Sequence, residues 1–286
     1  MKASLESLNA SSLNSFLVRG FEEKQFSAPY HLHPELELTL ILSGSGKRYV
    51  GSKMNDFYPG DFVLLGPNLP HCWKTEGEKN AEKSSSIVVQ FKKDFLGDSF
   101  FEKPEMMPVV QLLNKSDGGI KFTGDTTFYK NKMQGLFDEQ NSFKRVILLL
   151  DILHQLSLSK KKELIEKKKS NTVISVGEQQ RLHWVMAYIV EHFKEEVSLS
   201  KAAAIASMTS AAFCKYFKKI TRKTFIETVT DYRIDYAAQQ LINTSYSISQ
   251  ISFDSGFNDL SHFHKTFKAR MQLSPLCYRN IFLQRI

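Results

Sequence analysis

The front part of the chain alternates polar and apolar residues in a way that is typical of β-strands. Along the stretch HLHPELELTLIL, Leu36, Leu38, Leu40 and Leu42 fall on one face of an extended chain. The other face carries His31, His33, Glu35, Glu37, Thr39 and Ile41. Side chains of a strand alternate with a period of two, so the pattern predicts a strand with one apolar and one mainly polar face. Short strand-like segments with glycine and proline turns continue to about Gln90, which predicts a small barrel or sandwich.

Helical spacing replaces this alternation in the middle of the chain. We expect one helix at about 126–140 and a stronger one over NSFKRVILLLDILHQLSL. The apolar stripe expected on the second helix consists of Phe143, Val146, Ile147, Leu149, Leu150, Leu153 and Leu156. So wide a stripe has to be buried. The sequence leaves two coverings open, which are the barrel itself and a second copy of the chain in a dimer.

The rear part contains one helical pattern twice. Each copy is a short small-residue helix, a tight turn and a second helix with a polar face, in SLSKAAAIASMTSAAFCKYFKK and SISQISFDSGFNDLSHFHKTFK. A helix at about 177–193 is expected before the first copy, and a long connecting helix at about 224–243 between the two. Each copy is typical of a helix-turn-helix motif, whose second helix enters a DNA major groove.

Polar residues at the helix starts and apolar residues at helical spacing make this pattern specific. A serine or threonine at the N-cap stabilises a helix start, and the predicted caps are Ser200, Thr209 and Ser247. Gly256 is expected to supply a positive φ in the second turn. The side chains expected to face inward are Phe213, Phe217, Ile220, Ile226, Val229, Ile234, Ala237, Leu241, Ile248, Ile251, Phe253, Phe263 and Phe267.

The excess of basic residues lies in the rear part. From residue 171 onward there are 14 basic against 9 acidic residues, whereas residues 1–159 hold 18 against 19. The rear part is therefore the one expected to meet a polyanion. The basic run at 160–169 is expected to be an exposed helix end that leads into a linker.

Cysteine usage and the apolar runs indicate the compartment. Cys72, Cys214 and Cys277 are few and far apart, so we expect reduced thiols and a cytoplasmic location. The stretch MKASLESLNASSLNSF has no apolar core of a secretion signal, and the longest apolar run is far too short to span a membrane. No membrane partner is expected.

Two stretches of the front part carry candidate chemistry. An HxHxxxE pattern spans His31, His33 and Glu37, and a PGD…PNLPH stretch ends at His71. Both resemble the two motifs of the cupin family. In metal-binding cupins the matching side chains bind a divalent metal inside the barrel, and imidazole with carboxylate suits zinc, iron, nickel or manganese. The alternative, which we favour, is that these four residues line the pocket of a small-molecule effector and that no cofactor is bound.

The rear part resembles the AraC/XylS family of bacterial transcription regulators. The resemblance rests on ISFDSGFNDLSHFHKTFKARMQLSPLCYR and on LSKAAAIASMTSAAFCKYFKKITRKTF before it. Many members carry a cupin-like sensor in front, so the front part fits as well. The resemblance implies two recognition helices in successive major grooves, about 34 Å apart. Double-stranded DNA and a small-molecule effector are the implied partners, a homodimer is expected, and RNA polymerase is a candidate partner.

The family's base-facing positions map onto two sets of residues. In the first recognition helix they are Ala211, Cys214 and Lys215. In the second they are Leu260, Ser261, His262, His264 and Lys265. The expected phosphate partners are Lys218, Lys219, Arg222 and Lys268. Arg222 and Gln272 stand where the family usually has a glycine after each recognition helix, so different turn shapes are expected there.

These features predict a multi-domain α and β protein. It has an N-terminal cupin-like β-barrel with helices and a C-terminal all-α tandem helix-turn-helix domain. The expected boundaries are 1–125 for the sensor, 126–159 for a helical segment that supports dimerisation, 160–176 for the basic linker and 177–286 for the DNA-binding domain.

The leading function is a one-component, sequence-specific DNA-binding transcription regulator. The alternative is a cupin metalloenzyme, an isomerase or dioxygenase, with an appended helical domain. The front part offers no nucleophile or acid–base pair beyond the four candidate ligands, and the more specific motif lies in the rear part. We therefore assign no catalytic residue and expect no enzyme.

Overall fold

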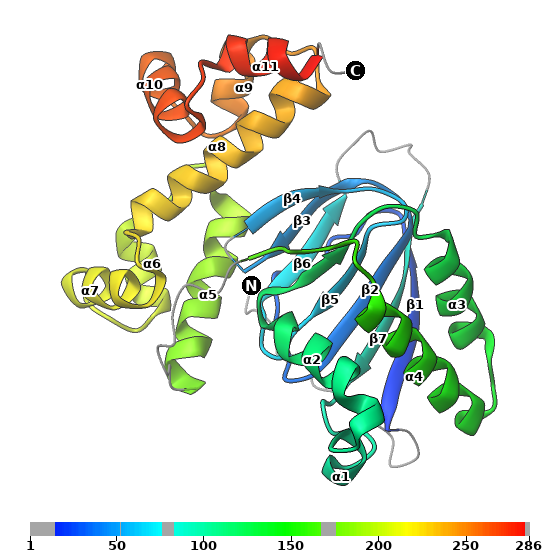
Figure 1. The fold of residues 1–286 in the computed structure, drawn as a ribbon. Coiled ribbons are helices and arrows are strands. Elements are labelled where there is room, and N and C mark those ends of the chain that lie inside the picture. Colours follow the sequence, from blue (N-terminus) through cyan, green and yellow to red (C-terminus); the bar gives the residue numbers. More distant parts are fainter. Residues whose placement is uncertain (1–14, 52, 76–82, 167–175, 284–286) are drawn as a thin grey trace. The chain divides into compact units, whose positions relative to one another are not determined.

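The computed structural model describes residues 15–51, 53–75, 83–166 and 176–283 (Figure 1). The chain divides into two compact units, residues 1–170 and 171–286, and each is described by itself. The first unit is rich in strands and the second is helical, as the sequence predicts. Among the described residues, no helix combines the length and the apolar character that a membrane crossing requires.

Two sheets form the framework of the first unit. The larger has six strands in the order β1-β7-β2-β5-β8-β9, and the smaller has three in the order β4-β3-β6. The strands are β1 Phe16–Glu23, β2 Leu36–Ser43, β3 Gly46–Val50, β4 Lys53–Phe57, β5 Phe62–Leu65, β6 His71–Thr75, β7 Ser84–Phe91, β8 Ile120–Phe122 and β9 Lys162–Leu164. All pairings between these strands are antiparallel. The prediction of a β-rich front part is confirmed.

The two faces of β2 are both buried but have different neighbours. Leu36, Leu38 and Leu40 belong to the main apolar core of this unit, which also contains residues of the helices that cover the sheet in Figure 1. On the opposite face, Glu37 and Thr39 are only 3% and 2% exposed and turn toward the interior between the sheets. The predicted alternation is therefore correct. The polar face lines an interior space.

Helices cover one side of the larger sheet (Figure 1). They are α1 Asp98–Phe101, α2 Met107–Lys115, α3 Thr127–Asp138 and α4 Ser142–Leu158, with two short 3-10 turns at Pro104–Met106 and Ser116–Gly118. The helices expected at about 126–140 and over NSFKRVILLLDILHQLSL are both confirmed.

The apolar stripe of α4 is only partly covered by its own unit. Leu149, Ile152, Leu153 and Leu156 are fully buried in the main core, and Val146 and Leu150 pack against it. Phe143 and Ile147 are instead 73% and 51% exposed. Packing on the sheet therefore accounts for one side of the stripe and leaves the other side open to a partner.

The basic run after α4 differs from the prediction. Lys162–Leu164 form β9, which pairs with β8 at the edge of the larger sheet, within the segment expected to be a linker. An edge strand keeps one side open to solvent, so it accommodates charged side chains such as Glu163, which is exposed. Residues 167–175 of the expected linker lie outside the described residues.

The second unit holds seven helices within its described residues. They are α5 Val176–His192, α6 Leu199–Ile205, α7 Ser210–Thr221, α8 Phe225–Asn243, α9 Ile248–Asp254, α10 Leu260–Met271 and α11 Pro275–Leu283. The pairs α6–α7 and α9–α10 are the two predicted helix-turn-helix motifs, and α8 connects them (Figure 1). Thr224 and Glu227 form a reciprocal capping box at the start of α8, which fixes the beginning of the connector.

Some local details differ from the sequence-based expectations. The N-cap of α6 is Ser198, whose side chain accepts a hydrogen bond from the backbone of Lys201, so the predicted cap at Ser200 is wrong. Ile226 and Phe253 were expected to face inward, but they are 55% and 53% exposed. In each case an adjacent residue takes the inward position, Phe225 beside Ile226 and Ser252 beside Phe253.

The turns after the recognition helices keep the left-handed shape without glycine. Arg222 has φ 62° and Gln272 has φ 60°, and both are the C-caps of their helices. The expectation of different turn shapes is therefore wrong. The turn between the two helices of the first motif also has a left-handed residue, Ser207, with φ 56°. The corresponding residue of the second motif is Gly256, with φ 86°. The backbone amides of Arg222 and Gln272 donate to the backbone carbonyls of Lys218 and Lys268, which offsets part of the steric cost of the left-handed conformation.

Candidate functional site

Four polar side chains meet between the two sheets of the first unit. His31 and His33 lie in the segment before β2, Glu37 lies on β2, and His71 begins β6. One candidate ligand atom from each residue lies within 4.8 Å of the others. The predicted grouping is therefore present in the structure.

The backbone brings the histidines into this cluster by a route that the sequence did not indicate. The strand expected to run from His31 through Glu37 begins only at Leu36, because Pro34 lacks the amide hydrogen that a ladder needs. His31 instead forms an isolated antiparallel bridge with His71, through backbone hydrogen bonds of 3.0 and 2.8 Å. Their rings lie 4.5 Å apart between centroids.

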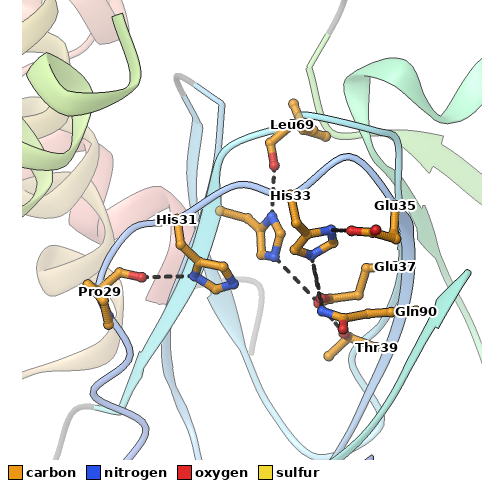
Figure 2. Close-up of polar contacts among 9 residues, drawn as sticks. Pro29, His31, His33, Glu35, Glu37, Thr39, Leu69 and Gln90 are labelled. Atoms are coloured by element: carbon orange, nitrogen blue, oxygen red, sulfur yellow. Dashed lines mark hydrogen bonds and ion pairs between the residues drawn. The ribbon is translucent and has the colours of Figure 1, made fainter. Parts of the chain in front are cut away.

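Glu37 is the centre of a buried hydrogen-bond network (Figure 2). His33 Nε2 lies 2.9 Å from its Oε2, and Gln90 Nε2 donates to the same oxygen at 3.0 Å. The Thr39 hydroxyl donates to Oε1 at 2.6 Å. A buried carboxylate requires such partners, since an unpaired one is costly to remove from water.

His31 and His71 present their second ring nitrogen to this cluster. Their Nδ1 atoms lie 2.9 Å from the Pro29 carbonyl and 2.7 Å from the Leu69 carbonyl. A carbonyl only accepts, so each Nδ1 carries the hydrogen, and Nε2 of a neutral ring keeps its lone pair. His71 Nε2 is buried without a hydrogen-bond partner among the described residues and lies 3.5 Å from Glu37 Oε1.

The protonation preferences differ among these groups. Burial, with the charge of His71, lowers the pKa of His31 to about 4, so His31 is neutral near pH 7. Burial alone would lower the pKa of His33, but the hydrogen bond and charge of Glu37 raise it overall. Burial would raise the pKa of Glu37, but His71 and the hydrogen bond from His33 hold it well below its ordinary value. The cluster thus favours a His33–Glu37 ion pair beside a neutral His31.

A cavity of about 180 Å³ adjoins this cluster. Its polar lining consists of Glu23, His31, Glu37, Thr39, Ser86 and Gln90. Its apolar lining consists of Phe21, Phe26, Ala28, Ile41, Trp73 and Val88. Trp73 Nε1 is buried and has no hydrogen-bond partner among the described residues. The cavity combines apolar walls with a small number of convergent polar groups, which is typical of a small-molecule site.

Of the residues that line this cavity, only His31 and Glu37 were predicted from the sequence, and Gln90 and Trp73 are among those that were missed. Gln90 reaches Glu37 because β2 and β7 pair with Glu37 opposite Gln90. Trp73 lies two residues beyond His71 on β6, and the alternation of that strand was the available signal.

The four-residue cluster fits a divalent metal ion by residue type and proximity. Three imidazoles and one carboxylate form a known donor set, and the hydrogen bonds from Nδ1 of His31 and His71 to backbone carbonyls direct both Nε2 atoms toward the cluster. His33 and Glu37, in contrast, are already hydrogen-bonded to each other. Of the four residues, only His31 and Glu37 also line the cavity, so the prediction that all four line an effector pocket holds for these two.

The second unit presents the predicted DNA-contacting residues on two helices. On α7, which Thr209 caps as predicted, Phe213 and Phe217 are buried. The exposed residues of this helix include Ala211, Ala212, Cys214, Lys215, Lys218 and Lys219. Every first-helix position expected to meet bases or phosphates is thus accessible, and its contact with DNA stays a prediction.

The second recognition helix has the same frame and a more polar outer face. Asp259 caps α10, and Phe263 and Phe267 are buried. The exposed residues include Leu260, Ser261, His262, His264, Lys265 and Lys268. The two helices therefore carry their apolar residues inward and leave their candidate contacts free for a ligand.

Two family models match the chain in this order. A cupin domain matches residues 18–84, and a helix-turn-helix domain matches residues 202–281. The uncharacterized HTH-type transcriptional regulator YdeC of Bacillus subtilis is 24% identical over 88% of this chain and 86% of its own length. The melibiose operon regulatory protein of Escherichia coli is 25% identical over 92% of this chain and 89% of its own.

A solved structure is also similar to part of the chain. It is the DNA-binding domain of AdpA, a global transcriptional factor, in complex with a target DNA, with 25% identity, a TM-score of 0.34 and coverage of 35% of this chain and 91% of that one. The relatives that match most of the chain are named as regulators of transcription and not as enzymes. The chain therefore carries a cupin domain in front of an AraC-type helix-turn-helix domain and is a DNA-binding transcription regulator.

Proposed function

We propose that this regulator binds a small-molecule effector in the cavity of its first unit and that occupancy of the cavity changes its affinity for DNA. The observation that carries the proposal is the cavity of about 180 Å³ between apolar walls and the Glu37 network. The expected ligand is compact, with an apolar body and a polar end. The buried Trp73 Nε1 offers a donor to an acceptor atom of that ligand.

A cavity-filling variant tests this proposal. Ile41 is 1% exposed and lines the cavity, so Ile41→Trp should occupy the space of the ligand. Leu158→Trp is the matched control, because Leu158 is 57% exposed on α4. A library of small organic acids, sugars and amines is screened by thermal shift on the full chain, followed by a DNA mobility shift.

The expected result is a compound that raises Tm and changes DNA affinity in the wild type and in Leu158→Trp, but not in Ile41→Trp. A ligand at 100 times its Kd stabilises the folded state by about 2.7 kcal/mol, which a thermal shift detects. A compound that acts equally on Ile41→Trp would place effector binding elsewhere.

A divalent metal at His31, His33, Glu37 and His71 is the second candidate for the same cluster. The observation in its favour is the approach of the four ligand atoms within 4.8 Å. We favour the metal-free pocket, because His33, Glu37, Thr39 and Gln90 already satisfy one another by hydrogen bonds. Elemental analysis of purified protein decides. A stoichiometric metal lost in His33→Ala but kept in His154→Ala, an exposed histidine of α4, would establish the metal site.

We further propose that α7 and α10 enter successive major grooves on one side of the duplex. The support is their matching frame and the exposure of their candidate contacts. Selection from a random DNA pool should recover two sequence blocks separated by about one helical turn. Recovery of a single block would mean that one helix alone contacts bases.

A homodimer through the open side of α4 is part of the same proposal. Phe143 and Ile147 expose an apolar surface to solvent, which a second copy of the chain would bury. Ile147→Lys should shift the full chain toward monomer in light scattering, with His154→Lys as the control on the same helix. Contact with RNA polymerase and a cytoplasmic location are proposed from the family resemblance alone.

A further inference from the structure

One side chain of the connecting helix joins the end of α5, the helix in front of the first helix-turn-helix motif, to the turn of the second motif. Arg233 of α8 donates from Nε to the Phe193 carbonyl and from Nη2 to the Glu195 carbonyl, each at 2.7 Å. Both carbonyls follow the end of α5, the helix in front of the first motif. The end of a helix leaves carbonyls unpaired and partly negative, so a guanidinium is a strong partner for them.

The same guanidinium meets the second motif. Its Cζ lies 5.9 Å from the ring centroid of Phe257, in the turn between α9 and α10. Gly256, next to it, has φ 86°, and a Cβ there would lie 2.7 Å from the Phe193 carbonyl oxygen and 3.0 Å from Arg233 Nε. The turn of the second motif therefore lies against the end of α5, and the Arg233 guanidinium contacts both of them.

A polar link at Asp231 joins the motifs as well. Its carboxylate pairs with Lys223, which follows the first recognition helix, at 2.5 Å and with Arg270 of α10 at 2.9 Å. Asp231 is partly exposed, so its ion pairs with Lys223 and Arg270 weaken as the salt concentration rises. Arg233 is half-buried and bonded to backbone carbonyls, so we expect its link to persist.

Each motif has an apolar core of its own, and the core of the second includes Phe257, the ring beside Arg233. Phe213, Phe217 and Phe225 pack together in the first, with ring centroids 5.5 to 5.8 Å apart. The second has its own cluster, which includes Phe263 and Phe267. Two separately packed cores joined by one helix can change their relative orientation when that helix bends. The contacts of Arg233 restrain such a change at the point where the cores meet.

We infer that Arg233 is a positioning residue for DNA recognition, which fixes the spacing and orientation of α7 relative to α10 and thereby sets the base-pair spacing that the protein accepts. The inference rests on the proposed two-groove binding mode. Rigid linkage of two binding elements raises the effective concentration of the second at its site and penalises a site with the wrong separation. Lysine has one ammonium group, so it cannot reproduce the planar bridge between two carbonyls and a ring.

A distance measurement without DNA tests the positioning role directly. Cys214 of α7 and Cys277 of α11 are exposed and Cys72 is buried, so the native chain accepts one spin label on the first motif and one on α11, whose Tyr278 packs against the core of the second motif. In the full chain, the label-to-label distance distribution should be narrow for wild type and for Arg181→Met, an exposed control on α5. It should broaden at least about twofold in Arg233→Met, with Arg233→Lys intermediate. An unchanged width in Arg233→Met overturns the inference.

The second measurement uses duplexes recovered from a random pool by the wild-type chain. One inserted base pair between the two blocks should cost the wild type about 100-fold in affinity and Arg233→Met about tenfold or less. Binding to a duplex with only one block should be equal for both proteins. An equal insertion penalty in both overturns the inference.

Two outcomes need separate treatment. If the wild type recovers no sequence, the proposed binding mode fails, and the spin-label widths alone decide the role of Arg233. If Arg233→Met is unfolded by circular dichroism, Arg233→Lys is measured in both experiments. Wild-type widths and penalties in Arg233→Lys would then contradict the inference.

Discussion

The two recognition helices share one frame and differ in their outer faces. Both α7 and α10 have 12 residues, a side-chain N-cap and a left-handed C-cap. Their caps, Thr209 and Asp259, lie fifty positions apart, and so do the buried phenylalanines Phe217 and Phe267. Packing and capping therefore reproduce the same helix twice from different sequences.

The corresponding outer positions carry different chemistry. Ala211, Ala212 and Cys214 of α7 correspond to Ser261, His262 and His264 of α10, while a lysine occupies the next position in both. Hydroxyl and imidazole groups donate to and accept from base edges, whereas a methyl group contacts only the methyl of thymine. The buried and capping residues therefore position each helix, and the exposed residues decide which base pairs it can distinguish. We expect α10 to contribute more sequence discrimination than α7.

The largest expected effect is a loss of folding stability, and it should be equal in the two motifs. Phe217→Ala and Phe267→Ala each remove a fully buried ring, so each should lower the free energy of unfolding by about 3–5 kcal/mol. Chemical denaturation followed by circular dichroism measures both. Phe253→Ala is the control, because a ring that is 53% exposed should cost less than about 1 kcal/mol. A small cost for one of the two buried rings would show that the frames are not equivalent.

The next effect concerns affinity for DNA and should differ between the two motifs. Lys265→Ala should lower affinity for the selected duplex by about 1–3 kcal/mol, because a lysine beside exposed serine and histidine groups is placed to donate to guanine. Lys215→Ala, the corresponding change in α7, should cost less. Mobility shifts on selected and scrambled duplexes measure the difference. An equal loss on both duplexes would make Lys265 a phosphate contact.

A smaller effect should again be shared. Lys218 and Lys268 lie in the last turns of α7 and α10 and are exposed, which suits contact with the DNA backbone. Lys218→Ala and Lys268→Ala should each weaken binding to selected and scrambled duplexes alike. The slope of log affinity against log salt should fall in magnitude by about 1 in each variant. A sequence-dependent loss in either variant would reassign that lysine to base recognition.

Local patterns predicted the frame well. Period-two alternation located β2, and helical spacing located α3, α4 and α8, because these patterns lie within one element. The short strand β9 was not predicted. A segment of three residues is too short to show a hydrophobic period, and this one forms a strand only because it pairs with the edge of β8. Ile226 and Phe253 show the same limit, because the apolar character of a residue does not state which face of a short helix is covered.

The four-residue cluster was predicted through its motif and not through its geometry. His31, His33, Glu37 and His71 were grouped correctly, although His31 and His33 reach the cluster from a segment before the strand. Gln90 could not be assigned, because its contact with Glu37 depends on the register between β2 and β7. Pairing between strands distant in sequence is set by the whole sheet, which a single stretch does not encode.

The smallest effect concerns the left-handed caps and distinguishes stability from DNA contact. Glycine avoids the steric cost of φ near 60° at Arg222 and Gln272, partly offset by its larger unfolded-state entropy. Arg222→Gly and Gln272→Gly should therefore each raise the free energy of unfolding, by about 0.5–1 kcal/mol. The gain should be the smaller for Gln272, whose side chain donates to the Ala269 carbonyl at 3.0 Å.

Ala269→Gly is the control of opposite sign, because glycine inside a helix should lower stability by about 1 kcal/mol. Arg222 is also a predicted phosphate partner, whereas Gln272 is not. Arg222→Gly should thus gain stability and lose some affinity for both selected and scrambled DNA, while Gln272→Gly gains stability with unchanged affinity. Denaturation and mobility shifts on the same two variants check this. A loss of stability in both would mean that the side chains at these caps stabilise the turns by more than the left-handed backbone costs, and that the departure from glycine is favourable in this chain.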